Sequence, residues 1–246
     1  MMKTKLALAF ALCAALSVAT PLFVANPSFE TATLTLNAGN GPFSQLIAGS
    51  PFGVGGTLNS WTASSTTSNA QAGAFAPTSG GINWTTKWWD ANNVGYVIAF
   101  QPGTVSLSQT LTDTLLSNTN YTLTVDVGRR TITTNFNYAI QVFAGTTLLA
   151  SASNLSLANN SSGTDFATYF SPVGNPLAGN ALKIVLLTNA GSAGTTEAFF
   201  DNVRLDAASA TVPEPGTLAM LSAGLAAILA TCRRRPSRMR KDTKTR

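Results

Sequence analysis

The feature that most constrains the fold is an alternation of apolar and polar residues with a period of two. It is clearest over 121–127, which reads Tyr-Thr-Leu-Thr-Val-Asp-Val. Successive side chains of a β-strand point to opposite faces, so the tyrosine, leucine and valines share a buried face and the polar residues share the other. The stretch therefore predicts a strand with one face packed on a core.

Similar segments recur along the chain, separated by turn residues such as Gly, Asn and Pro. The predicted strands are 94–100, 104–111, 135–144, 146–152, 165–170, 181–188 and 197–206. A strand is also expected over 22–30, with Pro27 at a sheet edge or a bulge, whereas the small, polar stretch 64–81 is expected to run over the surface. This pattern predicts an all-β fold, an antiparallel β-sandwich or jelly roll.

The last predicted strand carries an acid on its apolar face. Its alternation places Phe199, Asp201, Val203 and Leu205 on one side, so Asp201 should point inward. An unpartnered buried carboxylate is very costly. The residues leave two solutions open: a hydrogen bond or ion pair to a neighbour such as Arg204, or a bulge that turns Asp201 outward.

The N-terminus has the three parts of a secretory signal peptide. Lys3 and Lys5 are basic, Leu6–Leu16 is apolar, and Ser17-Val18-Ala19 supplies the small residues of a cleavage site. This order predicts export, with a signal peptide over 1–19 that is removed after Ala19.

A second three-part segment lies near the C-terminus: Val212-Pro213-Glu214-Pro215, the uncharged stretch Gly216–Cys232, and Arg233-Arg234-Arg235. The prolines interrupt any regular structure. As a helix the uncharged stretch would be about 25 Å long, near the lower limit for crossing a bilayer. The arginines would stay on the cytoplasmic side. The predicted segments are a body over 20–211, a sorting and transmembrane segment over 212–235, and a basic cytoplasmic tail over 236–246.

This C-terminal segment resembles the PEP-CTERM sorting signal of exported bacterial proteins, through Pro213-Glu214-Pro215, the short apolar helix and the arginine cluster. The resemblance implies an exosortase-type transpeptidase as partner, which cuts near the motif. It also implies passage through the inner membrane, followed by delivery to the cell surface or an extracellular matrix. The alternative is an ordinary single-span anchor that keeps the protein permanently tethered.

Setting the two ends aside changes the charge argument. The whole chain has a net charge of +5, but the body has five basic and eight acidic residues, a net charge of −3. The body therefore has no basic stripe for nucleic acid. Both cysteines, Cys13 and Cys232, lie in the ends, so neither a disulfide nor a thiolate metal site is expected in the body.

The chain contains no histidine, which excludes Ser-His-Asp triads, Cys-His dyads and the common zinc sites. Two carboxylates could hydrolyse glycosides, but no pair of acids lies in a recognisable motif. Arg129 and Arg130 could bind an anionic sugar, although a surface pair beside Asp126 is the preferred interpretation. We therefore expect that the body is not an enzyme.

The body resembles galactose-binding-like jelly rolls, which occur in many carbohydrate-binding modules. The resemblance rests on Asn26-Pro27-Ser28-Phe29-Glu30 at its start, on Phe200–Leu205 at its end and on Trp61 between them. It implies a structural calcium ion held by acids of the first and last strands, here Glu30 and Asp201. Oxygen-only coordination suits Ca²⁺.

Three tryptophans, Trp84, Trp88 and Trp89, lie close together next to Asp90. Flat aromatic faces can stack on sugars, and Asp90 could bind their hydroxyls, so these residues are the candidate glycan site. The alternative is that one or two of the rings cap the core.

The expected function is that of an exported cell-surface or exopolysaccharide-matrix protein with a non-catalytic β-sandwich in a structural, adhesive or glycan-binding role. Two alternatives remain open: a small secreted glycoside-active enzyme, and a surface protein that stays tethered to the membrane.

Overall fold

The computed structural model describes residues 18–37, 41–47, 56–77, 87, 89–90, 92–130, 135–192, 194–210, 223–225 and 228. Ser17–Ala210 form one compact unit, the body, and the two chain ends form another. Most of the predicted signal peptide and the whole of the Val212–Pro215 and Arg233–Arg235 motifs lie outside the described residues. No helix within the described part of the chain has the length and apolar character that a membrane crossing requires.

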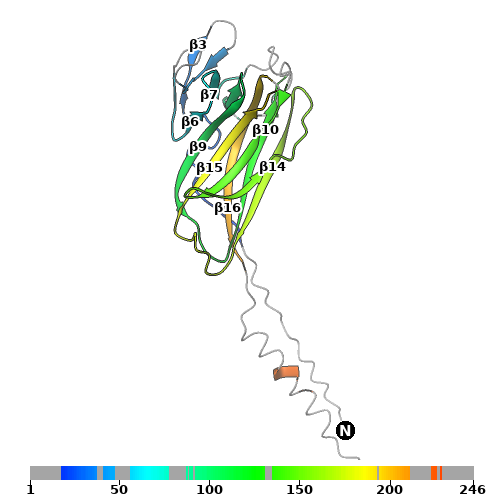
Figure 1. Cartoon of the computed structure of the whole chain (residues 1–246). Coiled ribbons are helices and arrows are strands. Elements are labelled where there is room, and N and C mark those ends of the chain that lie inside the picture. Colours follow the sequence, from blue (N-terminus) through cyan, green and yellow to red (C-terminus); the bar gives the residue numbers. More distant parts are fainter. Residues whose placement is uncertain are drawn as a thin grey trace, which may run out of the picture. The chain divides into compact units, whose positions relative to one another are not determined.

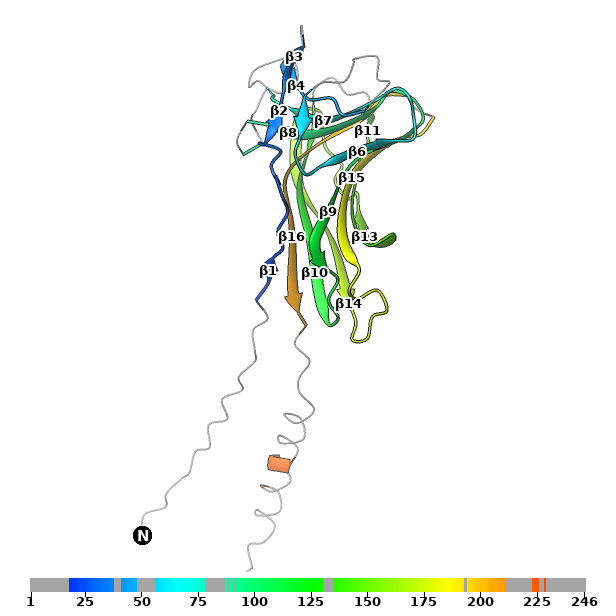
Figure 2. The same ribbon diagram turned by 90° about the vertical axis from the view of Figure 1, so that its left-hand side faces the viewer.

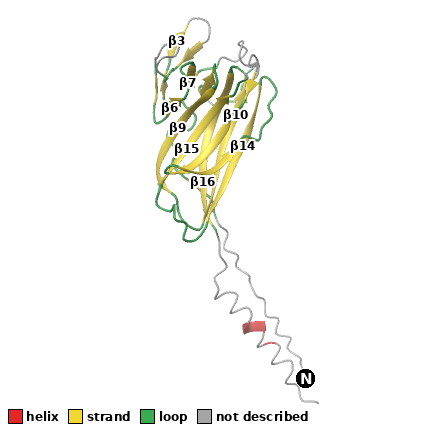
Figure 3. Cartoon of the chain, in the orientation of Figure 1, coloured by secondary structure: helices red, strands yellow, loops and turns green. Residues whose placement is uncertain are grey.

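The body is a sandwich of antiparallel sheets (Figures 1 and 3), which confirms the predicted fold class. The larger sheet has the order β14-β10-β16-β8-β7-β4-β3, and β1 and β11 also pair with β16. Its strands are β1 (Thr20–Pro21), β3 (Thr35–Asn37), β4 (Gly41–Phe43), β7 (Ala70–Phe75), β8 (Val94–Ala99), β10 (Thr119–Arg129), β11 (Asn135–Phe136), β14 (Ser161–Ser171) and β16 (Thr196–Ser209).

The smaller sheet has the order β13-β12-β15-β9-β6, and β2 and β5 form a separate pair. These strands are β2 (Ala32–Thr33), β5 (Thr57–Leu58), β6 (Thr62–Ser65), β9 (Gly103–Thr114), β12 (Ala139–Ala144), β13 (Thr147–Ala152) and β15 (Ala181–Ala190). Every strand pair is antiparallel except β11 with β16.

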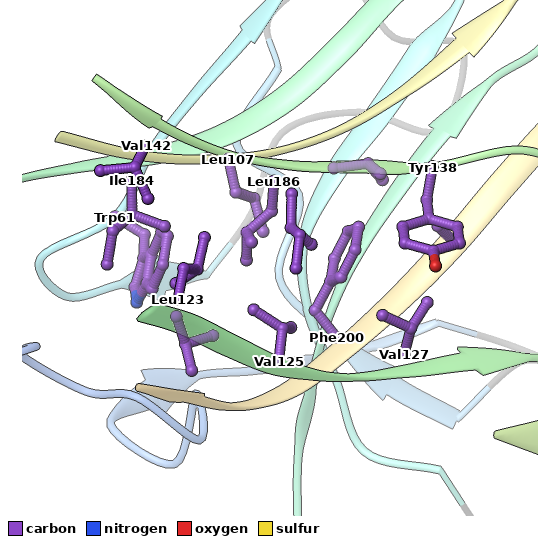
Figure 4. Close-up of a cluster of buried hydrophobic side chains, with 14 of the residues drawn as sticks. Trp61, Leu107, Leu123, Val125, Val127, Tyr138, Val142, Ile184, Leu186 and Phe200 are labelled. Carbon is purple, nitrogen blue, oxygen red and sulfur yellow. The ribbon is translucent and has the colours of Figure 1, made fainter. Parts of the chain in front are cut away.

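The core lies between the two sheets (Figure 4). Leu123, Val125 and Val127 of β10 point into it, as the alternation predicts, and Leu107 and Ile184 reach it from the smaller sheet. All five are almost completely buried. The contact between the two apolar faces is what makes these strands a stable pair of sheets, since burial of apolar surface is the main favourable term in folding.

Two expectations about local structure are wrong. The stretch 22–30 is not a strand: only Thr20–Pro21 pair with β16, and 25–29 form turns. The stretch 64–81 does not simply cross the surface, because it contains the end of β6 and all of β7, whose three alternating alanines are buried. Alanine and glycine carry little apolar signal, although a strand of small residues fits closely between its neighbours.

A β-bulge in β16 is a third departure from the expected pattern. Thr124 of β10 pairs with Arg204, but Asp126 pairs with Asp201, so the register shifts between them. Asn202 lies at the bulge in the left-handed region, with φ of 49°. Such a bulge inserts one residue and reverses which side chains face inward. Val203 and Phe200 therefore face the core, whereas Phe199 packs in a separate cluster and not beside Val203 and Leu205 as the sequence predicts.

A buried hydrogen-bond network fixes the segment between β13 and β14. The Tyr138 hydroxyl donates to Asp165 Oδ2 at 2.5 Å, and the backbone N–H and side-chain amide of Asn154 donate to its two oxygens at 2.9 and 3.1 Å. Burial alone would raise the pKa of Asp165, but these donors outweigh burial and hold the pKa below its usual value. The carboxylate thus stabilises the body in its ionised form.

The first prediction concerns this network. Because the folded-state pKa of Asp165 is depressed, its contribution to stability should be complete at neutral pH, should begin to fall as the pH drops below about 4, and should be lost as the pH falls through the lower folded-state pKa. Asp165→Ala should lower the free energy of unfolding by about 2–3 kcal/mol at pH 7. Urea denaturation across this pH range measures both effects. Asp113→Asn, at a partly exposed acid, serves as the control, and an equal loss in both variants would contradict the assignment.

Candidate functional site

The face of the larger sheet that points away from the core carries an unusual set of residues around the first half of β16. Glu197, Phe199 and Asp201 alternate on this outer face, and all three are buried. Their neighbours Ala198 and Phe200 belong to the core. Because both acids on this face are buried, other parts of the chain must cover them. Two buried acids beside a phenylalanine make this face the candidate functional site.

A cluster of aromatic rings is buried on this outer face. Phe199 stacks on Tyr96 with ring centroids 6.4 Å apart, and it lies 6.3 Å from Phe75. Trp89 belongs to the same buried cluster, together with apolar residues of β8. Tyr96 is fixed by its hydroxyl, which donates to the carbonyl of Ser44 at 2.8 Å. The cluster thus holds several buried rings in one place.

Glu197 lies at the edge of these rings and pairs with Arg130, which follows the end of β10. The guanidinium Nε donates to Glu197 Oε1 at 2.5 Å, and Nη2 donates to Oε2. The same guanidinium lies 5.6 Å from the centre of the Phe199 ring. β11 runs parallel to the start of β16 and places Phe136 opposite Glu197. A two-point ion pair between aromatic rings holds the carboxylate in one orientation.

Burial raises the pKa of the Glu197 carboxyl above its ordinary value, although the guanidinium of Arg130 acts to lower it. Only 1% of the Glu197 side chain is exposed, against 21% of Arg130. A carboxyl with a raised pKa in an apolar setting is suited to transferring a proton. Neighbouring ring faces attract cations. The arrangement therefore combines a carboxyl of raised pKa with ring faces that can stabilise positive charge.

Asp201 lies farther along β16 and is fully buried, but on the outer face and not on the core face: the bulge at Asn202 turns it outward, which is one of the alternatives expected from the sequence. Its carboxylate accepts the backbone N–H of Asp90 at 3.0 Å and that of Asn202 at 2.8 Å. Arg204 does not serve as its partner, because the Arg204 guanidinium donates to Asp206. Burial raises the pKa of Asp201 to about 7, the two backbone donors act against this, and the nearby charges of Asp90 and Asp126 add to it.

Glu30 is placed by the turn that begins the body. Asn26 and Phe29 adopt left-handed backbone conformations, and the turn buries the Phe29 ring 5.2 Å from that of Trp61. This leaves Glu30 outside the core, where its Oε1 accepts the backbone N–H groups of Asn92 and Asn93 at 2.9 and 2.7 Å. Glu30 and Asp201 therefore both bind backbone donors of the segment that leads into β8.

The two predicted calcium ligands bind different residues of the segment that leads into β8, and other acids do not join them into a metal-binding set. Among the described residues, no group of three or more His, Cys, Asp or Glu side chains could hold a metal ion. Calcium bound by Glu30 and Asp201 would therefore need carbonyl or amide oxygens for most of its coordination sphere. The calcium site stays a prediction.

The predicted glycan residues are only partly covered by the described structure. Trp84 and Trp88 lie outside the described residues. Trp89 is 5% exposed and packs in the aromatic cluster, whereas Asp90 is exposed and accepts a hydrogen bond from the Ser28 hydroxyl at 3.0 Å. The role of these residues in glycan binding stays a prediction.

A separate open groove of about 700 Å³ lies farther along the outer face. Its lining residues are Pro21–Val24, Pro27, Ser28, Thr124, Asp126, Thr164 and Asn202–Arg204. Several of the polar groups bond to one another: Asp126 accepts the Thr164 hydroxyl at 2.5 Å and the Asn202 amide at 2.9 Å. The groove and the Glu197 site are thus two distinct surfaces.

Comparison with known families identifies the family to which the body belongs. The model of the HpiC1 cyclase family matches residues 20–206, which is most of the chain. The chain belongs to the HpiC1 cyclase family. A second model, of the PEP-CTERM protein-sorting motif, matches residues 211–235 and confirms that resemblance. Among curated proteins, none matches the sequence.

Solved structures of cyclases have a fold similar to that of the body. The Stig cyclase FisC from Fischerella sp. TAU, in complex with (3Z)-3-(1-methyl-2-pyrrolidinylidene)-3H-indole, is 25% identical; the match covers 79% of this chain and 100% of FisC, with a TM-score of 0.66. A cyclase from the same organism, in complex with 4-(1H-indol-3-yl)butan-2-one, is 24% identical over 78% of this chain and 100% of its own, with a TM-score of 0.61. A carbohydrate-binding module, TmCBM61 in complex with beta-1,4-galactotriose, is 12% identical over 76% and 98%, with a TM-score of 0.42.

The expectation that the body is not an enzyme is wrong, because its family is one of cyclases and the similar FisC structure is that of a cyclase. The error lies in the argument from histidine. Its absence excludes triads and the common zinc sites, but a buried carboxyl can transfer protons without it.

The PEP-CTERM motif identifies the chain as an exported protein that passes through a membrane-associated sorting step.

Sequence reasoning missed the Glu197–Arg130 pair. It placed Arg130 on the surface beside Asp126, and it did not single out Glu197. One signal was available: Glu197 shares strand parity with Phe199 and Asp201, so it too has to be buried or covered. The sequence does not reveal that Arg130 is the partner of Glu197, because the two residues lie 67 positions apart in the chain.

A prediction follows for the calcium site. If Glu30 and Asp201 ligate Ca²⁺, added calcium should raise the melting temperature of the body and a chelator should lower it, because a ligand that binds only the native state stabilises it. Glu30→Ala and Asp201→Ala should each remove this calcium dependence, whatever they do to the baseline. Differential scanning calorimetry with and without chelator measures it. An unchanged melting temperature in the unaltered protein would rule out the site.

Proposed function

We propose that the protein is an exported cyclase that uses Glu197 as a general acid on a small, largely apolar substrate bound against Phe199 and Tyr96. The supporting observation is the buried Glu197–Arg130 pair at the edge of a fixed aromatic cluster. Membership of the HpiC1 cyclase family supports the reaction class.

The substrate class follows from the chemistry of the aromatic cluster. Aromatic rings favour contact with a flat aromatic molecule, and the related Fischerella cyclases were solved with indole-containing molecules. We therefore propose an indole-bearing substrate with an unsaturated side chain. Arg130 would hold the Glu197 carboxyl in place, and the buried position of Glu197 would keep water from competing for the proton.

The proposed reaction is an isomerisation: substrate and product have the same composition, and no co-reactant is needed. The protonated Glu197 transfers its proton to the substrate, and the resulting cation lies over the aromatic cluster. A π bond of the side chain attacks the cationic carbon, which forms a carbon–carbon bond and closes the ring. The new cation then loses a proton, and the Glu197 carboxylate recovers it.

Export places this reaction outside the cytoplasm. We propose that the signal peptide is removed after Ala19, since the family match and β1 both begin at residue 20. An exosortase-type enzyme would then process the chain near Pro213-Glu214-Pro215 and release the body to the cell surface or the exopolysaccharide matrix.

A mutation of the proposed acid tests the mechanism. Glu197→Gln keeps the size of the side chain but cannot donate the carboxyl proton, so turnover should fall by about 10²–10⁴-fold. The assay incubates the protein with 3-alkenyl indoles and detects, by liquid chromatography and mass spectrometry, a product of unchanged mass and altered retention. Calorimetric titration with 4-(1H-indol-3-yl)butan-2-one should give similar affinity in both proteins.

The matched control is Asp206→Asn, which changes an acid of the same strand that pairs with Arg204 far from the aromatic cluster. It should retain full turnover. Equal activity of the Glu197→Gln variant and the unaltered protein would contradict the proposed role of Glu197. Failure of any indole to bind would contradict the substrate class.

A further inference from the structure

The end of the body at which β16 finishes carries a surface whose loops contain no charged residue, next to the acid Asp113. It is formed by two loops, 115–118 and 172–180, which we call the neutral end. Leu115 N–H donates to the Asn180 carbonyl at 2.9 Å, and Gly179 N–H donates to the Leu115 carbonyl at 2.8 Å, so the loops form one surface. Neither loop contains an acidic or basic residue, nor does the nearby turn 145–146.

Apolar side chains project from the neutral end into solvent. Leu116 is 56% exposed and Val173 is 73% exposed. Both loops are held by hydrogen bonds: Leu116 N–H donates to the Tyr121 hydroxyl at 2.7 Å, and the Asn175 amide donates to the Tyr169 and Ser171 hydroxyls. The apolar side chains are therefore presented by ordered loops, and inserting them into an apolar medium would cost little ordering entropy.

Both ends of the body's chain leave from this region. Thr20 pairs with Ala207, and Figure 2 shows β1 and the end of β16 together at the end that also carries the loop after β14. Ala210 is bound to the loop that carries Leu116: its N–H donates to the Asn118 carbonyl and its carbonyl accepts the Asn118 amide, both at 2.8 Å.

The chain length then limits how far this surface can lie from a membrane. Only Thr211–Pro215 separate Ala210 from the apolar segment that begins at Gly216. Five residues span at most about 18 Å when fully extended. The headgroup layer of a bilayer is itself about 5–8 Å thick on each side. A body tethered through the sorting segment is therefore confined close to the bilayer surface at its neutral end.

We propose that the neutral end is a membrane-contacting surface, which rests on the lipid headgroup region while the sorting segment anchors the chain. Leu116 and Val173 insert among the lipids, and the absence of charge removes the desolvation cost that a charged loop would meet. Two side chains are too few to anchor the body alone, so the contact ends when the tail is removed. The surface orients the body for processing and turns the Glu197 site away from the membrane-facing loops.

The test uses the chain from Thr20 to Arg246, with Cys232 replaced by Ser, reconstituted into protein-free vesicles of phosphatidylethanolamine and phosphatidylglycerol. Val173→Cys and Gln101→Cys each receive an environment-sensitive fluorophore. Gln101 is exposed and lies in the turn before β9, at the opposite end of that strand from Leu115. Chains that float with the vesicles are measured, with and without lipids that carry a quencher.

The fluorophore at position 173 should shift to shorter wavelength and should be quenched at least twofold more than that at position 101. Leu116→Ser should reduce the shift at 173 without changing the melting temperature, because Leu116 is exposed. Equal quenching at the two positions would overturn the proposal, as would a shift at 173 that is unaffected by Leu116→Ser. Since the vesicles contain no other protein, the readout reports lipid contact and is independent of catalysis.

Discussion

The pairing of β16 with β10 through the bulge at Asn202 is the constraint on which the rest of the structure depends. A regular strand of this length would keep one set of side chains inward throughout. The inserted residue allows Phe200 and Val203 both to reach the core, while Glu197 and Asp201 stay on the outer face. One strand therefore supplies both the middle of the core and the acids of the candidate site.

The bulge also separates two chemical environments on that outer face. Before it, Glu197 pairs with Arg130 and lies beside aromatic rings, where a raised pKa favours proton transfer. At the bulge, Asp201 binds backbone N–H groups and secures the segment that leads into β8. The two buried acids of β16 therefore have different roles because their partners differ. Glu197 binds an arginine beside aromatic rings, and Asp201 binds backbone N–H groups.

The sequence predicts the sandwich because strand alternation is local: β10, β15 and most of β16 follow from their own residues. It also predicts that Asp201 is buried, but its alternation places Asp201 on the core face, whereas the bulge puts it on the outer face. It does not reveal β7, whose alanines lack an apolar signal, or the bulge at Asn202, which depends on the neighbouring strand. The candidate acid requires contacts across the fold, since Arg130 reaches Glu197 only after β10 and β16 pair. The absence of histidine does not exclude catalysis, because a single positioned carboxyl can transfer protons and leaves no local motif in the sequence.

A structure of the body in complex with 4-(1H-indol-3-yl)butan-2-one tests the central claim most directly. The account predicts that the indole ring lies over Phe199 and Tyr96 and that the ligand's ketone oxygen lies within hydrogen-bonding distance of the Glu197 carboxyl. A ligand bound instead in the groove beside Asp126, or one whose polar atom has no contact with Glu197, would contradict it.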